Sequence, residues 1–401
     1  MTPQQSIEHA IQTLVDAGQL AGAAALVSRD GEVQTVTVGR RDLATGLPVE
    51  RDTIFRIASM SKPVTTVAAL TLLDEGRFAL DDPISICAPE LARMRVLCDS
   101  EGPLDETVDL GRPIIFRDLL THLAGFTYGD FHRGPIGRAC AEALGTTIDN
   151  SRTPDEWIAR LATLPLVDQP GAGFHYGVST DLLGFLLARL EGEPLGAVLH
   201  RRVFAPLGMR DTGFTVPREK RERRAGLCGF DADGRLTSLT AAPGGHALGE
   251  RPDDMTFESG GQGLWSTLDD YLAFARLLIG DGGTELLRPE TLAMMTSNQL
   301  TPAQRGAARM FGRPIFAAGH GYGMGVAVVM EPEKADPLRC RGGVGTIGWP
   351  GAYGGWWQAD PNDRSVLIFL AHNMVELPQM ARGIGLEVWS AIAGFHEIAM
   401  T

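Results

Sequence analysis

Apolar residues recur at helical spacing near the start of the chain and through most of its middle. In residues 1–18 they form one stripe, with polar residues between Ile7, Ile11, Leu14 and Val15. An almost unbroken apolar segment at 64–73, closed by Gly76, predicts a buried helix. The same spacing predicts helices in the central part of the chain at 116–123, 153–161, 180–190, 195–204, 267–279 and 289–295.

Strand patterns lie near the two ends of the chain. Two apolar runs flank Arg29-Asp30-Gly31, and Asp-Gly in that position predicts a β-hairpin of 23–28 with 32–39. Further strands are expected at 53–57, 322–330, 352–359 and 365–371, before a final helix with Met380, Ile384, Val388 and Ile392 along one stripe. The pattern predicts an α/β (α+β) fold with an antiparallel sheet flanked by helices. Residues 1–79 and 300–401 would form one discontinuous domain, with 80–299 as an inserted α-rich domain.

Composition narrows the class of protein. Of 401 residues, 44% are hydrophobic and 21% charged, which is typical of a globular protein with a sizeable core. A net charge of −13 argues against binding to nucleic acid. Residues 1–18 lack the basic and apolar regions of a secretory signal, and no apolar run has the length of a membrane span. Five scattered cysteines favour reduced thiols, so we expect a cytoplasmic protein with no membrane partner.

The segment around Ser59 carries the first candidate chemistry. Ser59 and Lys62 stand three residues apart where the buried helix begins, so both side chains rise from one face of one turn. A serine hydroxyl needs a nearby base, and a buried lysine can supply it. Free N–H groups at a helix N-terminus also suit an oxyanion. The alternative interpretation is an N-cap serine followed by a surface lysine, because S-x-x-K is a common pattern.

Other catalytic motifs find no support. No serine has glycine at both −2 and +2, and no H-E-x-x-H occurs. The G-x-G-x-x-G at 343–348 leads into Trp349-Pro350 and lacks a βαβ setting. His122 is interpreted as a packed, hydrogen-bonded residue rather than a base for Ser59. No metal site is expected.

Tyr176 is a better candidate partner for Lys62. It lies in the glycine-rich segment 170–179, just before the predicted helix at 180–190. A phenol beside a lysine ammonium can share a proton with it. A core tyrosine whose hydroxyl is tied to the backbone is the competing interpretation.

Several stretches resemble, in the right order, the serine β-lactamase and penicillin-binding-protein superfamily, above all its class C branch and the family VIII carboxylesterases. The S-x-x-K segment is followed by Leu119-Leu120-Thr121-His122-Leu123-Ala124-Gly125, Pro170-Gly171 through Tyr176, Pro206-Leu207-Gly208-Met209, Gly260-Gly261-Gln262-Gly263-Leu264 and Gly348-Trp349-Pro350-Gly351. The resemblance covers nearly the whole chain and implies a β-lactamase/transpeptidase-like fold. It assigns Ser59 as nucleophile, with Lys62 and Tyr176 as its proton-transfer partners.

Two departures from the class C pattern bear on the substrate. Val178 stands at the asparagine position of Y-x-N, and Trp349 replaces the lysine of K-T-G. In the family that lysine helps to bind the substrate carboxylate, whereas an indole packs against an acyl or aryl group. A third motif that begins with tryptophan resembles the family VIII esterases, which favours a small carboxylic ester as substrate.

The resemblance thus implies a serine carboxylesterase without a cofactor. The backbone N–H groups of Ser59 and Ala352 would form the oxyanion hole. Substrate-binding residues are predicted to be Phe126, Tyr128, Val178, Trp349 and Gly351. The alternatives on the same fold are a β-lactamase, a D-aminopeptidase or other amide hydrolase, and an acyltransferase. Outside the enzymes, a penicillin-binding or muropeptide sensor would acylate and stall. The sequence leaves the oligomeric state open.

Overall fold

The computed structural model describes residues 1–401 except 133, 243–244, 311–312, 317–318, 375–378 and 381. Its centre is a seven-stranded sheet in the order β11-β12-β13-β14-β15-β1-β2, in which every neighbouring pair is antiparallel. The strands are β1 (Gly22–Arg29), β2 (Glu32–Gly39), β11 (His320–Tyr322), β12 (Ala327–Val329), β13 (Ile347–Gly351), β14 (Gly355–Asp360) and β15 (Ser365–Ala371). Strands from both ends of the chain therefore share one sheet.

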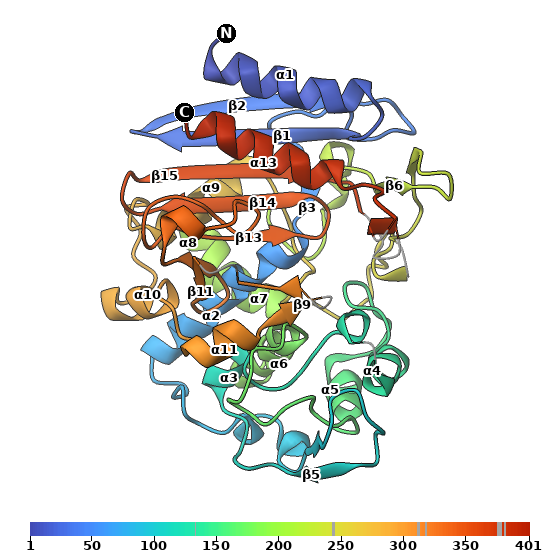
Figure 1. Ribbon diagram of the computed structural model, residues 1–401, viewed down its shortest axis with the longest axis vertical. Coiled ribbons are helices and arrows are strands. Elements are labelled where there is room, and N and C mark those ends of the chain that lie inside the picture. Colours follow the sequence, from blue (N-terminus) through green and yellow to red (C-terminus); the bar gives the residue numbers. More distant parts are fainter. Residues whose placement is uncertain (133, 243–244, 311–312, 317–318, 375–378, 381) are drawn as a thin grey trace.

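Helices α1 (Pro3–Asp16) and α13 (Glu387–Ala399) pack on one face of this sheet, and α9 (Leu268–Leu278) packs on the other. The other described α-helices are α2 (Ser61–Asp74), α3 (Phe116–Leu120), α4 (Pro135–Leu144), α5 (Pro154–Leu161), α6 (Ser179–Glu191), α7 (Leu195–Leu199), α8 (Ala205–Leu207), α10 (Pro289–Met295) and α11 (Pro302–Ala307). The terminal helices α1 and α13 pack together on one face, where Ile7 and Ile392 belong to the same buried cluster (Figure 1). The larger core lies on the other face and continues into the helical part of the molecule.

Four two-stranded ribbons complete the fold. They are β3 (Phe55–Arg56) with β8 (Trp265–Ser266), β4 (Arg95–Leu97) with β5 (Thr107–Asp109), β6 (Cys228–Phe230) with β7 (Leu236–Ser238), and β9 (Arg309–Met310) with β10 (Arg313–Pro314). The predicted antiparallel sheet flanked by helices is confirmed. The division into residues 1–79 with 300–401 and residues 80–299 stays a prediction, and α9 from within the second range packs on β15.

Local signals in the sequence account for several elements. The predicted hairpin is β1–β2, where Asp30 (φ 53°) and Gly31 (φ 82°) provide the left-handed turn. Thr153 caps α5 through a capping box with Glu156. The segment 195–204 is not one α-helix: α7 gives way to a π-helical turn, His200–Phe204. No helix in the described part of the chain has the length and apolar character to cross a membrane.

The prediction of one continuous strand at 322–330 is wrong. The segment forms two short strands, β11 and β12, joined by a tight turn at 323–326. Gly325 in this turn has φ 78°, and a Cβ there would lie 2.5 Å from Thr66 Oγ1 on α2. The turn therefore presses against the helix that carries Lys62, and alternating hydrophobicity alone does not reveal such a contact.

The contact between this turn and α2 can be measured as stability. We expect Gly325→Ala to lower the free energy of unfolding by about 3 kcal/mol, because the methyl group adds overpacking to the cost of a left-handed backbone. Gly283 is the matched control: its φ is 66° and a Cβ there would meet nothing within 4 Å. Gly283→Ala should cost only about 1 kcal/mol. Equal losses in urea titrations of the two variants would contradict the proposed contact.

Candidate active site

Ser59 lies in a buried 3₁₀ turn, Ala58–Met60, between β3 and α2. Ala58 has φ 43°, a left-handed conformation that costs a residue with a side chain about 1–2 kcal/mol. Neighbouring segments hold the turn in this conformation. The N–H of Ile57 donates to the Leu264 carbonyl (3.0 Å), and the Tyr271 hydroxyl donates to the Met60 carbonyl (2.9 Å). The predicted helix start is therefore displaced by one short turn, and Ser59 is fixed just before α2.

Lys62 is fully buried in the first turn of α2. Its Nζ donates to Ser59 Oγ (3.3 Å), to the Tyr128 hydroxyl (3.2 Å) and to the Gly261 carbonyl (2.9 Å). An ammonium group has three donors, and each of them has an acceptor here. The interpretation of Lys62 as a surface lysine is therefore wrong, and its nitrogen lies within hydrogen-bonding distance of the serine hydroxyl.

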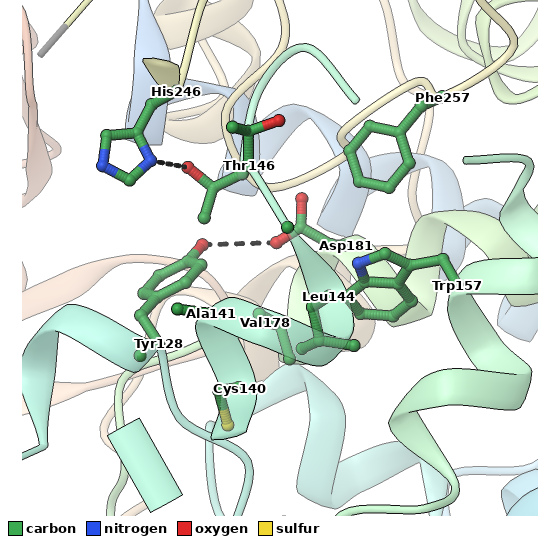
Figure 2. A pocket seen from close by; sticks show the side chains of 13 residues that line it. Tyr128, Cys140, Ala141, Leu144, Thr146, Trp157, Val178, Asp181, His246 and Phe257 are labelled. Carbon is green, nitrogen blue, oxygen red and sulfur yellow. Dashed lines mark hydrogen bonds between the residues drawn. The ribbon is translucent and has the colours of Figure 1, made fainter. Parts of the chain in front are cut away.

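Tyr128 links Lys62 to a buried carboxylate. Its hydroxyl donates to Asp181 Oδ2 at 3.2 Å, a bond drawn in Figure 2. Burial, together with the negative charge of Asp181, raises the pKa of Tyr128 well above its ordinary value. Tyr128 thus keeps its proton at neutral pH and acts as an acceptor toward Lys62 and a donor toward Asp181.

Tyr176 lies on another side of the same ammonium. Lys62 Nζ is 4.7 Å from the centroid of its ring, and its hydroxyl oxygen accepts a hydrogen bond from Trp349 Nε1 at 3.0 Å. An N–H donor and a nearby cation both stabilise negative charge that develops on a phenol oxygen. Of the two tyrosines beside Lys62, Tyr176 accepts a hydrogen bond from an indole N–H, whereas Tyr128 donates to a carboxylate. The part of Tyr176 in proton transfer stays a prediction.

His122 packs against the ring of Tyr176 and, within the described residues, forms no hydrogen bond with Ser59. Its ring lies 4.9 Å from that of Tyr176 and 5.6 Å from that of Phe174, measured between centroids. The prediction of a packed histidine is confirmed, but its hydrogen-bonding part is wrong: within the described residues neither ring nitrogen has a partner. Burial and the charge of Lys62 lower the pKa of His122 well below its ordinary value, so the ring is neutral.

The third motif, Trp349-Pro350-Gly351, forms the end of β13 beside the Ser59 turn. A Cβ on Gly351 would lie 2.5 Å from the Ile57 carbonyl oxygen, so only glycine allows this approach. Ala352 follows and belongs to the same small apolar cluster as Ala58. The structure thus brings the two residues predicted to form the oxyanion hole into one neighbourhood, while their role stays a prediction.

Two of the predicted substrate-binding residues, Val178 and Phe126, line pockets whose walls do not include Ser59. Val178 is one wall of a small pocket, about 40 Å³ in volume, which is also lined by Tyr128 and Asp181 (Figure 2). Its apolar walls include Leu144, Trp157 and Phe257, but the pocket does not reach Ser59 or Lys62. Phe126 lines a different, smaller pocket together with Ile136. Substrate contacts of Val178 and Phe126 stay predictions.

Sequence analysis missed two contributors to the site. The pattern at 180–190 predicts an apolar helix and assigns no role to Asp181. A single carboxylate in the first turn of an apolar helix is nevertheless a signal of a buried polar contact. Gly261 belongs to the glycine motif at 260–264, and that motif does not predict that the Gly261 carbonyl accepts a hydrogen bond from Lys62. Among the described residues, no group of three or more His, Cys, Asp or Glu side chains is arranged to hold a metal ion.

The chain is similar to known proteins over nearly its whole length. The family model described as Beta-lactamase matches residues 7–387. Protein Rv1367c of Mycobacterium tuberculosis is 42% identical over 393 residues, which cover 97% of this chain and 93% of that protein. Esterase EstB of Burkholderia gladioli is 32% identical over 361 residues, covering 85% of this chain and 83% of the esterase.

A solved structure shows the same fold. EstCE1, described as a hydrolase with promiscuous acyltransferase activity, superposes with a TM-score of 0.77 at 27% identity. The match covers 97% of this chain and 98% of EstCE1. The sheet and helices of this chain are thus arranged as in EstCE1 over essentially the whole length of both proteins.

Proposed function

The chain belongs to the beta-lactamase family of serine hydrolases, which here includes esterase and acyltransferase relatives, and on that premise we propose that it is a carboxylesterase acting on small esters. The observation that carries the proposal is the buried Lys62 nitrogen 3.3 Å from Ser59 Oγ, with Tyr176 beside it. A serine so placed has a proton acceptor within reach.

The proposed reaction proceeds through an acyl-enzyme. Ser59 Oγ attacks the ester carbonyl, and its proton passes to the Lys62–Tyr176 pair. The oxyanion accepts hydrogen bonds from the backbone N–H groups of Ser59 and Ala352. The pair then gives the proton to the departing alcohol, which leaves the acyl group on Ser59. Water, deprotonated by the same pair, attacks this ester and releases the carboxylic acid, so that Ser59 regains its proton.

Trp349 favours an ester over a penicillin. The residue is 1% exposed, and its only polar atom already donates to Tyr176. It therefore offers no charge to a substrate carboxylate at the position where the class C pattern has lysine. A cation does stack on the indole, since the Arg339 guanidinium carbon lies 5.2 Å from the ring centroid. Because the charge of Arg339 lies near the site, the substrate class is decided by comparing an ester with a β-lactam directly.

The substrate class is tested by assaying the purified protein on p-nitrophenyl butyrate and on nitrocefin. We expect a higher kcat/KM for the ester, and a loss of about 1,000-fold or more in ester cleavage in Ser59→Ala. Tyr176→Phe should be similarly impaired while remaining folded. Faster turnover of nitrocefin would overturn the esterase proposal in favour of a β-lactamase. Ester cleavage that yields mainly the transfer product when an alcohol is added would favour an acyltransferase.

The hydrogen bond from Trp349 can be tested by replacing the indole with a smaller aromatic ring that has no N–H donor, with a second buried tryptophan as the control for the lost volume. In Trp349→Phe we expect kcat/KM for the ester to fall by about tenfold, because Tyr176 loses a donor that stabilises charge on its oxygen. Trp356 is a matched control: it is equally buried, but its indole nitrogen has no partner among the described residues. Trp356→Phe should change kcat/KM by less than about twofold. Equal effects of the two substitutions would remove Trp349 from the mechanism.

A further inference from the structure

Two of the three hydrogen-bond acceptors of Lys62 are held by one carboxylate. Tyr128 donates its hydroxyl proton to Asp181 Oδ2 (3.2 Å), and the N–H of Gly261 donates to Asp181 Oδ1 (3.0 Å). Lys62 in turn donates to the oxygen of that hydroxyl and to the carbonyl of Gly261. Asp181 therefore fixes both groups that, with Ser59, determine where the ammonium lies.

The surroundings of Asp181 are those of a buried anion. It is 2% exposed and lies in the first turn of α6, where the helix dipole favours negative charge. Ser259 Oγ also donates to Oδ1, so three donors converge on the two oxygens. Burial raises the pKa of Asp181, while Lys62 and these donors oppose the shift. A Cβ on Gly261 would lie 2.7 Å from Asp181 Oδ2, so the carboxylate requires glycine there.

The other titratable groups around the Lys62–Tyr176 pair carry no negative charge that could replace Asp181. Those that interact electrostatically with Lys62 or Tyr176 are His122, Tyr128, Tyr322 and Arg339. Burial keeps His122 neutral and, by raising their pKa values, keeps Tyr128 and Tyr322 protonated. Within the described part of the chain, Asp181 is thus the anion bonded into this network.

We propose that Asp181 is a positioning residue that holds Lys62 against Ser59 and sets the pH range in which the Lys62–Tyr176 pair takes the serine proton. The inference rests on the proposed function, since it assigns that pair to activate Ser59. The negative charge of Asp181 favours the protonated form of the pair. Its removal makes loss of that proton easier, whichever of the two side chains carries it.

In Asp181→Asn the direction of the pH shift is set by the role of the Lys62–Tyr176 pair as a base. The pair must lose a proton before it can act as a base, so activity rises with pH along the acidic limb of the kcat/KM profile. In Asp181→Asn this limb should move to lower pH by about one unit. The plateau should also fall about 10- to 100-fold, because an amide cannot accept all three hydrogen bonds and Lys62 is held less firmly. A merely structural role would lower the plateau without moving the limb.

The experiment measures ester kcat/KM against pH and, separately, the rate at which an alkyl fluorophosphonate labels Ser59. Labelling forms the Oγ–P bond, releases fluoride and transfers the serine proton to the pair, so it reports activation of Ser59 without assuming an ester substrate. Asp270→Asn is the matched control. Asp270 occupies the equivalent third position of α9, is also buried with a raised pKa, and accepts its hydrogen bonds from Asp211 N (2.7 Å) and Thr212 Oγ1 (2.8 Å).

Both profiles should shift in Asp181→Asn and stay in place in Asp270→Asn. Tyr128→Phe keeps the ring but cuts one of the two links between Lys62 and Asp181 and removes a hydrogen-bond acceptor of the Lys62 ammonium, so it should shift the limb in the same direction. Combining it with Asp181→Asn should add less than the sum of the two shifts. This second variant keeps the test decisive if Asp181→Asn does not fold.

The outcomes separate the inference from the function on which it rests. A folded Asp181→Asn whose labelling profile matches that of the unsubstituted protein overturns the role of Asp181 and leaves Ser59 as nucleophile. An unshifted limb in Tyr128→Phe overturns it as well. If Ser59 in the unsubstituted protein takes no label at any pH, the proposed function itself fails.

Discussion

A buried ammonium group, Lys62 Nζ, is the constraint on which the site depends. A charge removed from water costs several kcal/mol unless hydrogen bonds and an opposite charge compensate it. Here all three of its protons have acceptors, and two of those acceptors lead to Asp181. One of the acceptors is also Ser59, so the contacts that allow the lysine to be buried bring it to the serine hydroxyl.

The rest of the fold serves to bring these groups together. Ser59 comes from the turn before α2 and Lys62 from the first turn of that helix. Tyr128 comes from the loop after α3, Asp181 from α6 and Gly261 from the segment before β8. The end of β13 closes the site, because Gly351 approaches Ile57 and Trp349 donates to Tyr176. The departures from the class C pattern fit this arrangement. Val178 has no polar side-chain atom, and the acceptors of Lys62 besides Ser59 are Tyr128 and Gly261.

Local patterns in the sequence predicted those features of the structure that depend on interactions between residues close together in the chain. The β1–β2 hairpin followed from Asp-Gly, α5 from its capping box, and the pairing of Ser59 with Lys62 from the spacing of one helical turn. The partnership of Tyr128 with Asp181 was not predictable in this way, because 53 residues separate them and neither lies in a recognisable motif. The break between β11 and β12 is likewise set by the contact of Gly325 with Thr66 rather than by periodicity. Tertiary contacts of this kind leave no periodic trace.

The central claim is that Ser59, activated beside Lys62, carries the acyl group during turnover. The most direct measurement mixes the protein rapidly with p-nitrophenyl butyrate, quenches the mixture in acid and determines which peptide gains a butyryl group by mass spectrometry. The account predicts that the modified residue is Ser59 and that Ser61, whose hydroxyl accepts a hydrogen bond from the Leu264 N–H (3.1 Å), stays unmodified. Butyrylation of another residue with Ser59 unmodified throughout turnover would contradict it.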